Sequence, residues 1–133
     1  MGVLNPAPGF IERPDHQVAV VPVHDRVVLK LGRETVADTK NALTVYESNY
    51  PPRYYFPKAD IRMNLLEPTE WETHCPFKGD ARYWTVNAGG YVIENGAWAY
   101  DEPFDETAAL TGFISFYAEK MCLEVNGKKA EPA

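Results

Sequence analysis

The chain has 133 residues, 45% of them hydrophobic and 24% charged, and this length suits one domain with a single core. An apolar content this high excludes disorder for most of the chain. The formal net charge is −6, and the 13 basic residues are scattered along the sequence. This distribution argues against a nucleic-acid-binding protein, because phosphate backbones attract clusters of lysine and arginine.

The sequence also lacks the marks of a membrane, secreted or metal-binding protein. Apolar runs such as residues 18–21 are far shorter than the roughly 20 residues that span a bilayer. The N-terminus has no basic region followed by an apolar stretch, so no secretory signal is predicted. The two cysteines, Cys75 and Cys122, form neither a disulfide framework nor a paired-cysteine zinc motif. We therefore expect a cytoplasmic protein without a metal or other cofactor.

The N-terminal half of the chain is expected to be extended. Residues 1–23 form a predicted approach segment in which four prolines interrupt any helix, although residues 18–21 could pair as an edge strand. Three strands are predicted next, over residues 26–31, 34–38 and 42–46, with a turn at Gly32-Arg33 between the first two. Alternation in the third strand places Leu43 and Val45 on one face, and Thr44 and Tyr46 on the other.

The C-terminal half has more strands and one predicted helix. The strands are expected over residues 72–75, 81–87, 91–94, 97–100 and 122–125, with a hairpin turn at Gly89-Gly90 and a bulge or second turn at Asn95-Gly96. A helix is predicted from Asp105, its N-cap, to Met121, because apolar residues recur there at three- and four-residue spacing.

These elements together predict one mainly β domain over residues 24–126, followed by a frayed tail over residues 127–133. Short strands and shaped turns of this kind are typical of a small antiparallel barrel or sandwich, here with one C-terminal α-helix.

One short motif contains a candidate reactive group. Cys75 and Lys78 lie on either side of a predicted turn, and a nearby ammonium group favours the thiolate form of a cysteine. His74 is a poorer partner for Cys75, because adjacent residues of a strand point to opposite faces. Cys75 and Lys78 are therefore the candidate catalytic residues. The alternative is that Cys75 is a small buried apolar residue and Lys78 belongs to an exposed turn.

Aromatic residues gather in two regions, residues 46–56 and 83–100. Aromatic walls with a few polar groups form good small-molecule pockets and can also hold a cation, but the same rings can simply fill a core. The candidate ligand-binding residues are the aromatic Tyr54, Tyr55, Trp84, Trp98 and Tyr100 and the polar Glu47, Asp60 and Asn95.

Several motifs in a fixed order resemble a known family. They are VADT at 36–39, YYFP at 54–57 with Asp60, MNLL at 63–66, THCPFKG at 73–79, Tyr83-Trp84, NGAWAY at 95–100 and Phe116-Tyr117. From about His24 to Val125 the chain resembles the bacterial family called domain of unknown function 427, sometimes labelled a nucleotidyltransferase domain. Asn64 stands where the family usually has an aspartate.

The resemblance implies a compact β-rich domain, similar in shape to the β-tent folds of zinc-bearing relatives but without their paired cysteines. The function expected first is the binding of an unknown small molecule in an aromatic-lined pocket. An enzyme that uses Cys75 and Lys78 is an alternative, as is a nucleotidyltransferase, although no glycine-serine element with a D-x-D or D-x-E pair is present. A homodimeric interaction module is the third alternative.

Overall fold

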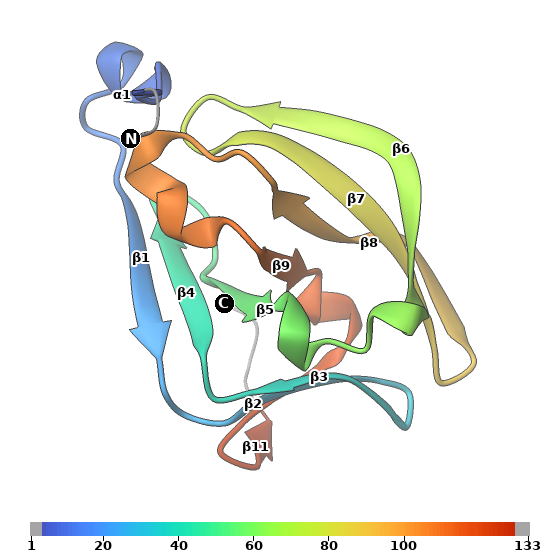
Figure 1. The fold of residues 1–133 in the computed structure, drawn as a ribbon. Helices are drawn as coiled ribbons and strands as arrows, with labels where there is room; N and C mark the ends of the chain where they lie inside the picture. The colour runs from blue at the N-terminus through green and yellow to red at the C-terminus, as the bar shows by residue number, and fades with distance from the viewer. Residues whose placement is uncertain (1–3, 130–133) are drawn as a thin grey trace.

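This computed structural model describes residues 4–129. Most of these residues belong to strands, and the strands form two antiparallel sheets (Figure 1). The larger sheet has seven strands in the order β1-β4-β5-β9-β8-β7-β6. Their bounds are Val18–Val23 (β1), Ala42–Glu47 (β4), Arg53–Pro57 (β5), Leu66–Cys75 (β6), Gly79–Ala88 (β7), Tyr91–Tyr100 (β8) and Phe113–Phe116 (β9).

The smaller sheet has four strands in the order β11-β10-β2-β3. Their bounds are Val27–Leu31 (β2), Glu34–Thr39 (β3), Cys122–Val125 (β10) and Lys128–Lys129 (β11). The helices described within residues 4–129 are short: Gly9–Glu12 (α1) and the 3₁₀ helices Lys58–Asp60 (η1), Met63–Leu65 (η2), Asp105–Leu110 (η3) and Ala118–Lys120 (η4). None of these helices is long and apolar enough to cross a membrane.

The mainly β class predicted from the sequence is confirmed, and each predicted strand overlaps an observed one. Strands β5 and β9 and the first part of β6, residues 66–71, were not predicted as strands. Residues 18–21 belong to β1, an edge strand that pairs with β4. The barrel alternative is wrong, because the larger sheet ends at β1 on one side and at β6 on the other. In the tail predicted over residues 127–133, Lys128 and Lys129 pair with β10, and residues 130–133 lie outside the described part of the chain.

The helix predicted from Asp105 to Met121 is wrong. Residues 105–110 form the 3₁₀ helix η3, and Gly112, with φ +84°, turns the backbone into β9. This strand pairs with β5 on one side and β8 on the other. Ile114 and Phe116 alternate into the core, so the apolar spacing that suggested a helix also fits a buried strand. Two ladders of backbone hydrogen bonds favour the strand.

The two faces of the larger sheet pack against different partners. One face packs on the smaller sheet and forms the main core with residues such as Leu29, Phe56 and Trp84. The other face carries a second cluster, which includes Tyr55, Tyr83 and Trp98. Neighbouring residues of one strand, such as Tyr55 and Phe56, therefore enter different clusters.

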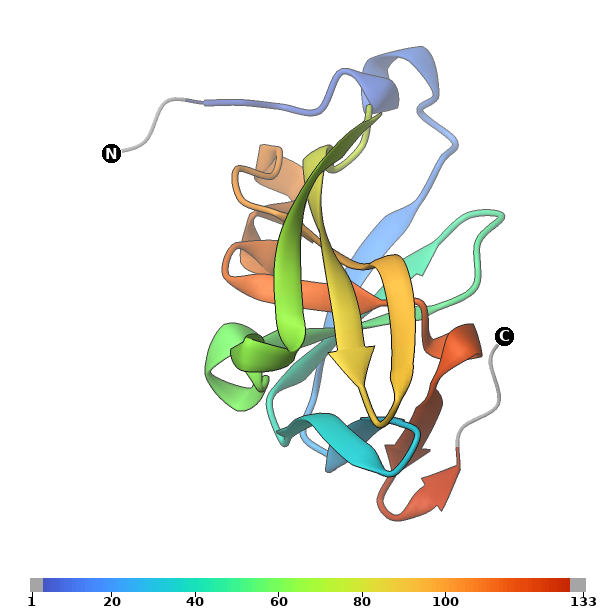
Figure 2. The same ribbon diagram turned by 90° about the vertical axis from the view of Figure 1, so that its right-hand side faces the viewer.

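A bulge in β8 sets the direction of its second half. Asn95 adopts φ +53°, and the pairing of β7 with β8 shifts so that Trp84 faces Ala97 while Val86 faces Ile93. The interruption at Asn95-Gly96 is thus a bulge within one long strand. Figure 2 shows β6, β7 and β8, in green to orange-yellow, lying side by side with the β7–β8 turn beside the cyan β2–β3 hairpin.

Candidate functional site

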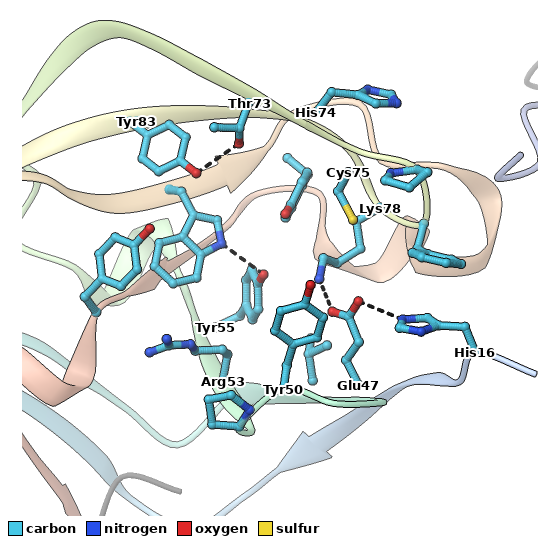
Figure 3. Close-up of a pocket in the computed structure, with 17 residues that line it drawn as sticks. His16, Glu47, Tyr50, Arg53, Tyr55, Thr73, His74, Cys75, Lys78 and Tyr83 are labelled. Carbon is cyan, nitrogen blue, oxygen red and sulfur yellow. Dashed lines mark hydrogen bonds and ion pairs between the residues drawn. The ribbon is translucent and has the colours of Figure 1, made fainter. Parts of the chain in front are cut away.

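A pocket of about 520 Å³ opens on the face of the larger sheet that carries the second cluster (Figure 3). Strands β4, β5, β6, β7 and β8, the turn between β6 and β7 and the segment before β1 all contribute to it. Its walls combine aromatic rings with charged groups. The lining residues are His16, Val45, Glu47, Tyr50, Pro51, Arg53, Tyr55, Thr73, His74, Cys75, Pro76, Phe77, Lys78, Tyr83, Trp98, Tyr100 and Tyr117.

A buried ion pair lies on one side of the pocket. Glu47 ends β4 on the same face as Val45, and its side chain is only 8% exposed. Its Oε1 accepts a hydrogen bond from the Lys78 ammonium, and its Oε2 lies 2.9 Å from His16 Nε2. Lys78 is equally enclosed, and its Nζ lies 5.9 Å from the centre of the Tyr100 ring. Each charge requires the other, because an unpaired charge in such a place is costly.

The N-terminal segment closes the same side of the pocket. The His16 ring stacks on Phe77, with 3.9 Å between ring centres and 19° between planes. Phe10 contacts the same ring edge-on, and the Gly9 backbone N–H donates to the Pro76 carbonyl at 2.9 Å. The segment therefore packs against the β6–β7 turn, which carries Lys78.

Trp98 lies at the centre of the aromatic wall. Its Nε1 donates a hydrogen bond to the Tyr55 hydroxyl at 3.2 Å. The centre of its ring lies 4.6 Å from the centre of the Tyr117 ring. The Arg53 guanidinium lies 5.5 Å from the ring centres of both Trp98 and Tyr117, within cation–π range. Arg53 also donates to Glu119 at 2.9 Å, and this hydrogen bond holds the pKa of Glu119 below its ordinary value.

Tyrosine hydroxyls supply most of the uncharged polar groups. The Tyr83 hydroxyl lies 2.9 Å from Thr73 Oγ1. Burial raises the pKa of Tyr55 and the pKa of Tyr100 well above the ordinary value. Both hydroxyls are therefore protonated at neutral pH and can donate hydrogen bonds.

Strand alternation places Cys75 in the pocket. Cys75 and Thr73 lie on one face of β6 and are among the lining residues. The His74 ring points away from the pocket in Figure 3, and its Nδ1 lies 2.7 Å from Asp80 Oδ1. His74 is therefore not a base for Cys75. Cys75 is half-buried.

The structure brings together six of the ten residues singled out from the sequence: Glu47, Tyr55, Cys75, Lys78, Trp98 and Tyr100. The other four lie elsewhere. Tyr54 and Trp84 point to the main core, because they alternate with Tyr55 and Tyr83. Asp60 accepts a hydrogen bond from Thr39 Oγ1 at 2.7 Å, and Asn95 accepts one from Thr69 at 2.6 Å in the bulge.

Sequence reasoning missed several lining residues, among them His16, Arg53, Thr73, Tyr83 and Tyr117. Strand alternation could have identified two of them, because residues two apart in a strand point to the same face. Arg53 precedes Tyr55 by two residues in β5, and Thr73 precedes Cys75 by two residues in β6. Nothing in its local sequence marks His16, which reaches the pocket only through the path of the N-terminal segment.

The side chains that could bind a metal ion are dispersed over the described residues. Within residues 4–129, no three His, Cys, Asp or Glu side chains come together in an arrangement that could hold a metal ion.

A family model matches most of this chain, including nearly all of the pocket. The family model described as Domain of unknown function (DUF427) matches residues 19–127. The chain belongs to the DUF427 family. A search of curated proteins finds no match. Apart from His16, the residues that line the pocket all fall within the part of the chain that matches the DUF427 model.

Proposed function

We propose that this DUF427 domain binds a small organic molecule in the aromatic pocket. The observation that carries the proposal is the convergence of aromatic rings and a buried ion pair on one cavity of about 520 Å³. Pockets that hold small ligands usually measure roughly 300–1,000 Å³ and combine apolar walls with a few placed polar groups.

A fragment screen by NMR tests the proposal. The ¹⁵N-labelled protein is titrated with a library of ring-containing fragments that includes acids, amides, amines and nucleosides. We expect binders whose chemical-shift changes concentrate on β4, β5, β8 and the β6–β7 turn. A complete lack of binders, or changes confined to other surfaces, would contradict the proposal.

The two cysteines provide an independent readout. Cys75 lines the pocket, whereas Cys122 lies in β10 of the smaller sheet, and both are half-buried free thiols. A pocket ligand should slow alkylation of Cys75 by iodoacetamide and leave the rate at Cys122 unchanged. Equal protection of both thiols would indicate general stabilisation, and would count against binding in the pocket.

An enzyme that uses Cys75 is the second candidate, because Cys75 and Lys78 line the same pocket. The Lys78 ammonium is paired with Glu47, which reduces its effect on a thiolate. The rate of alkylation measured against pH distinguishes the two candidates. An activated Cys75 reacts faster than Cys122 below pH 8, whereas a cysteine that only lines a binding pocket does not.

The label NTP transferase attached to the family suggests a third candidate. Nucleotidyl transfer usually requires Mg²⁺ held by clustered carboxylates, and Glu47 is the carboxylate among the residues that line the pocket. Binding is therefore the function that these residues support better. Incubation with labelled nucleoside triphosphates and Mg²⁺ tests the transferase, and release of pyrophosphate would favour it.

A further inference from the structure

The ligand class can be inferred from the hydrogen-bonding groups that remain free in the pocket; this inference rests on the proposed binding function. Both oxygens of Glu47 already have partners, Lys78 on one side and His16 on the other. The pocket therefore offers a ligand little carboxylate acceptor capacity.

The free groups are mainly donors. The Lys78 ammonium has three N–H groups, and Glu47 accepts a hydrogen bond from it. The Tyr55 oxygen accepts from Trp98 Nε1, which leaves the phenolic hydrogen to donate. The Tyr100 hydroxyl has no hydrogen-bond partner among residues 4–129, although its residue is only 6% exposed. A phenol can donate or accept a hydrogen bond, but the remaining hydrogens of Lys78 and Tyr55 can only donate, and this arrangement favours acceptor atoms on the ligand.

The charges around the pocket limit how much negative charge a ligand can carry. Arg53 and Lys78 face the pocket against the single carboxylate of Glu47, whereas the whole chain carries a net charge of −6. Among the lining residues alone this leaves one positive charge in excess, but Glu119, which is not a lining residue, pairs with Arg53 and balances it. This balance disfavours a polyphosphate, so the preference for a single carboxylate rests on the hydrogen-bond donors of the pocket.

A cationic ligand is disfavoured for a specific reason. The place where a cation would bind, beside Glu47 and near the face of the Tyr100 ring, is occupied by the ammonium of Lys78. An amine would have to displace Lys78 and leave a second buried positive charge.

We infer that the pocket takes a small aromatic monocarboxylate. The carboxylate accepts hydrogen bonds from donors among Lys78, Tyr55 and Tyr100, and the flat body packs against the rings around Trp98. Aromatic pairs prefer offset or edge-on contacts, and Tyr55 and Trp98 already show such an edge-on arrangement, with interplanar angle 88°.

Matched ligand series test the inference by NMR titration at pH 7.5. One series is benzoate, benzamide and benzylamine, and the other is indole-3-acetate, indole-3-acetamide and tryptamine. Within each series we expect the carboxylate to bind about 10-fold more tightly than the amide, because charged hydrogen bonds are the stronger ones. We expect the amine to bind most weakly.

Two variants identify the donors. Tyr100→Phe keeps the ring and breaks no hydrogen bond within the described residues, so it should fold and lose a large part of the preference for the carboxylate. Glu47→Gln combined with Lys78→Met removes both partners of the ion pair, and with them the Lys78 donor, and should also reduce the preference. Tyr46→Phe is the matched control, because Tyr46 is 50% exposed on the opposite face of β4.

The possible outcomes separate the ligand class from the binding function. Amides or amines that bind in this pocket as tightly as the carboxylates would overturn the inferred class and leave the binding function standing. The same holds if Tyr100→Phe keeps the full preference. Failure of every fragment in the wider screen would overturn the binding function itself.

Discussion

At the scale of single residues, Glu47 connects separate parts of the pocket wall. It holds Lys78 and His16 in place, and these come from a turn and from the N-terminal segment, two parts of the chain that are distant in sequence. Alternation along β4 predicts that Glu47 shares a face with Leu43 and Val45. The identity of its partners could not be predicted, because both lie 31 residues away.

The Glu47–Lys78 pair should show strong energetic coupling. Glu47→Gln or Lys78→Met alone should reduce the free energy of unfolding by about 2–4 kcal/mol, since each leaves a buried charge without its partner. The double variant should lose markedly less than the sum of the two single losses. Urea unfolding of the four proteins measures the coupling, and strictly additive losses would mean that the pair is not formed in solution.

A second residue-scale prediction concerns Thr44. Its Oγ1 is fully buried, and it has no hydrogen-bond partner within the described part of the chain. Thr44→Val removes this unpaired hydroxyl without changing the shape of the side chain, so it should raise the free energy of unfolding by about 1 kcal/mol. The measurement is thermal and urea unfolding.

Thr39→Val is the matched control for Thr44→Val. Thr39 is also buried, but its Oγ1 donates to Asp60 and accepts from the Asn41 backbone N–H. We expect this variant to lose about 1–2 kcal/mol. A loss of stability in Thr44→Val as large as that in Thr39→Val would show that the Thr44 hydroxyl is hydrogen-bonded.

At the scale of elements, the hairpin turns determine how the two sheets meet. Gly89 in the β7–β8 turn lies against the β2–β3 turn, and a Cβ added to it would lie 2.2 Å from the Leu31 carbonyl oxygen. The sequence marks Gly89-Gly90 as a turn. It does not show that one of the two glycines is a contact between sheets, since that depends on how distant strands pack.

Two substitutions separate turn geometry from packing. Gly89 and Gly90 both have positive φ, +59° and +85°, but a Cβ on Gly90 would have no atom within 4 Å. Gly90→Ala should cost about 1–2 kcal/mol from backbone strain alone. Gly89→Ala should cost about 2 kcal/mol more, because Leu31 or the turn must move. Equal losses in urea unfolding would mean that the turns do not touch.

The strand β9 explains why element prediction failed at one place. Local spacing in residues 105–121 favours a helix, although Ile114 and Phe116 alternate in a way that also fits a short buried strand. Pairing with β5 and β8 decides for the strand, and these partners lie far away in the sequence. Local patterns contain no information about such pairings.

At the scale of the whole molecule, the N-terminal segment completes the pocket. Backbone hydrogen bonds anchor it along its length. The N–H groups of Asn5 and Ala7 donate to the carboxylates of Asp105 and Glu106, respectively. The N–H group of Gly9 donates to the carbonyl oxygen of Pro76. Most of this segment precedes the part of the chain that matches the family model. The pocket wall that it forms is therefore a contribution of residues outside the match.

Removal of residues 1–16 tests this contribution. Both sheets should persist, because β1 begins at Val18, and the far-UV circular dichroism should change little. The free energy of unfolding should fall by about 2–4 kcal/mol, since Phe77 and Glu47 lose their contacts with this segment. Fragments found to bind the full chain should bind the shortened protein more weakly. Unchanged affinity would show that the segment is not part of the site.

A homodimer stays a prediction at this scale. Both edge strands of the larger sheet carry exposed apolar side chains, Val21 on β1 and Trp71 on β6. Light scattering at several concentrations measures the oligomeric state.

The sequence by itself determined the β class, the positions of most strands and the face to which each strand residue points, because these follow from alternation and turn residues within a few positions of one another. Only the tertiary structure decided that a strand, β9, forms where a helix was predicted. It also decided that Tyr55 and Tyr83 line the pocket, whereas Tyr54 and Trp84 point to the main core. The contact between His16 and Glu47 is a third feature that it alone decided. The physical reason is that strand order and the path of the N-terminal segment depend on packing between residues that are far apart in the chain. A local sequence pattern does not reveal the free energy of such long-range contacts.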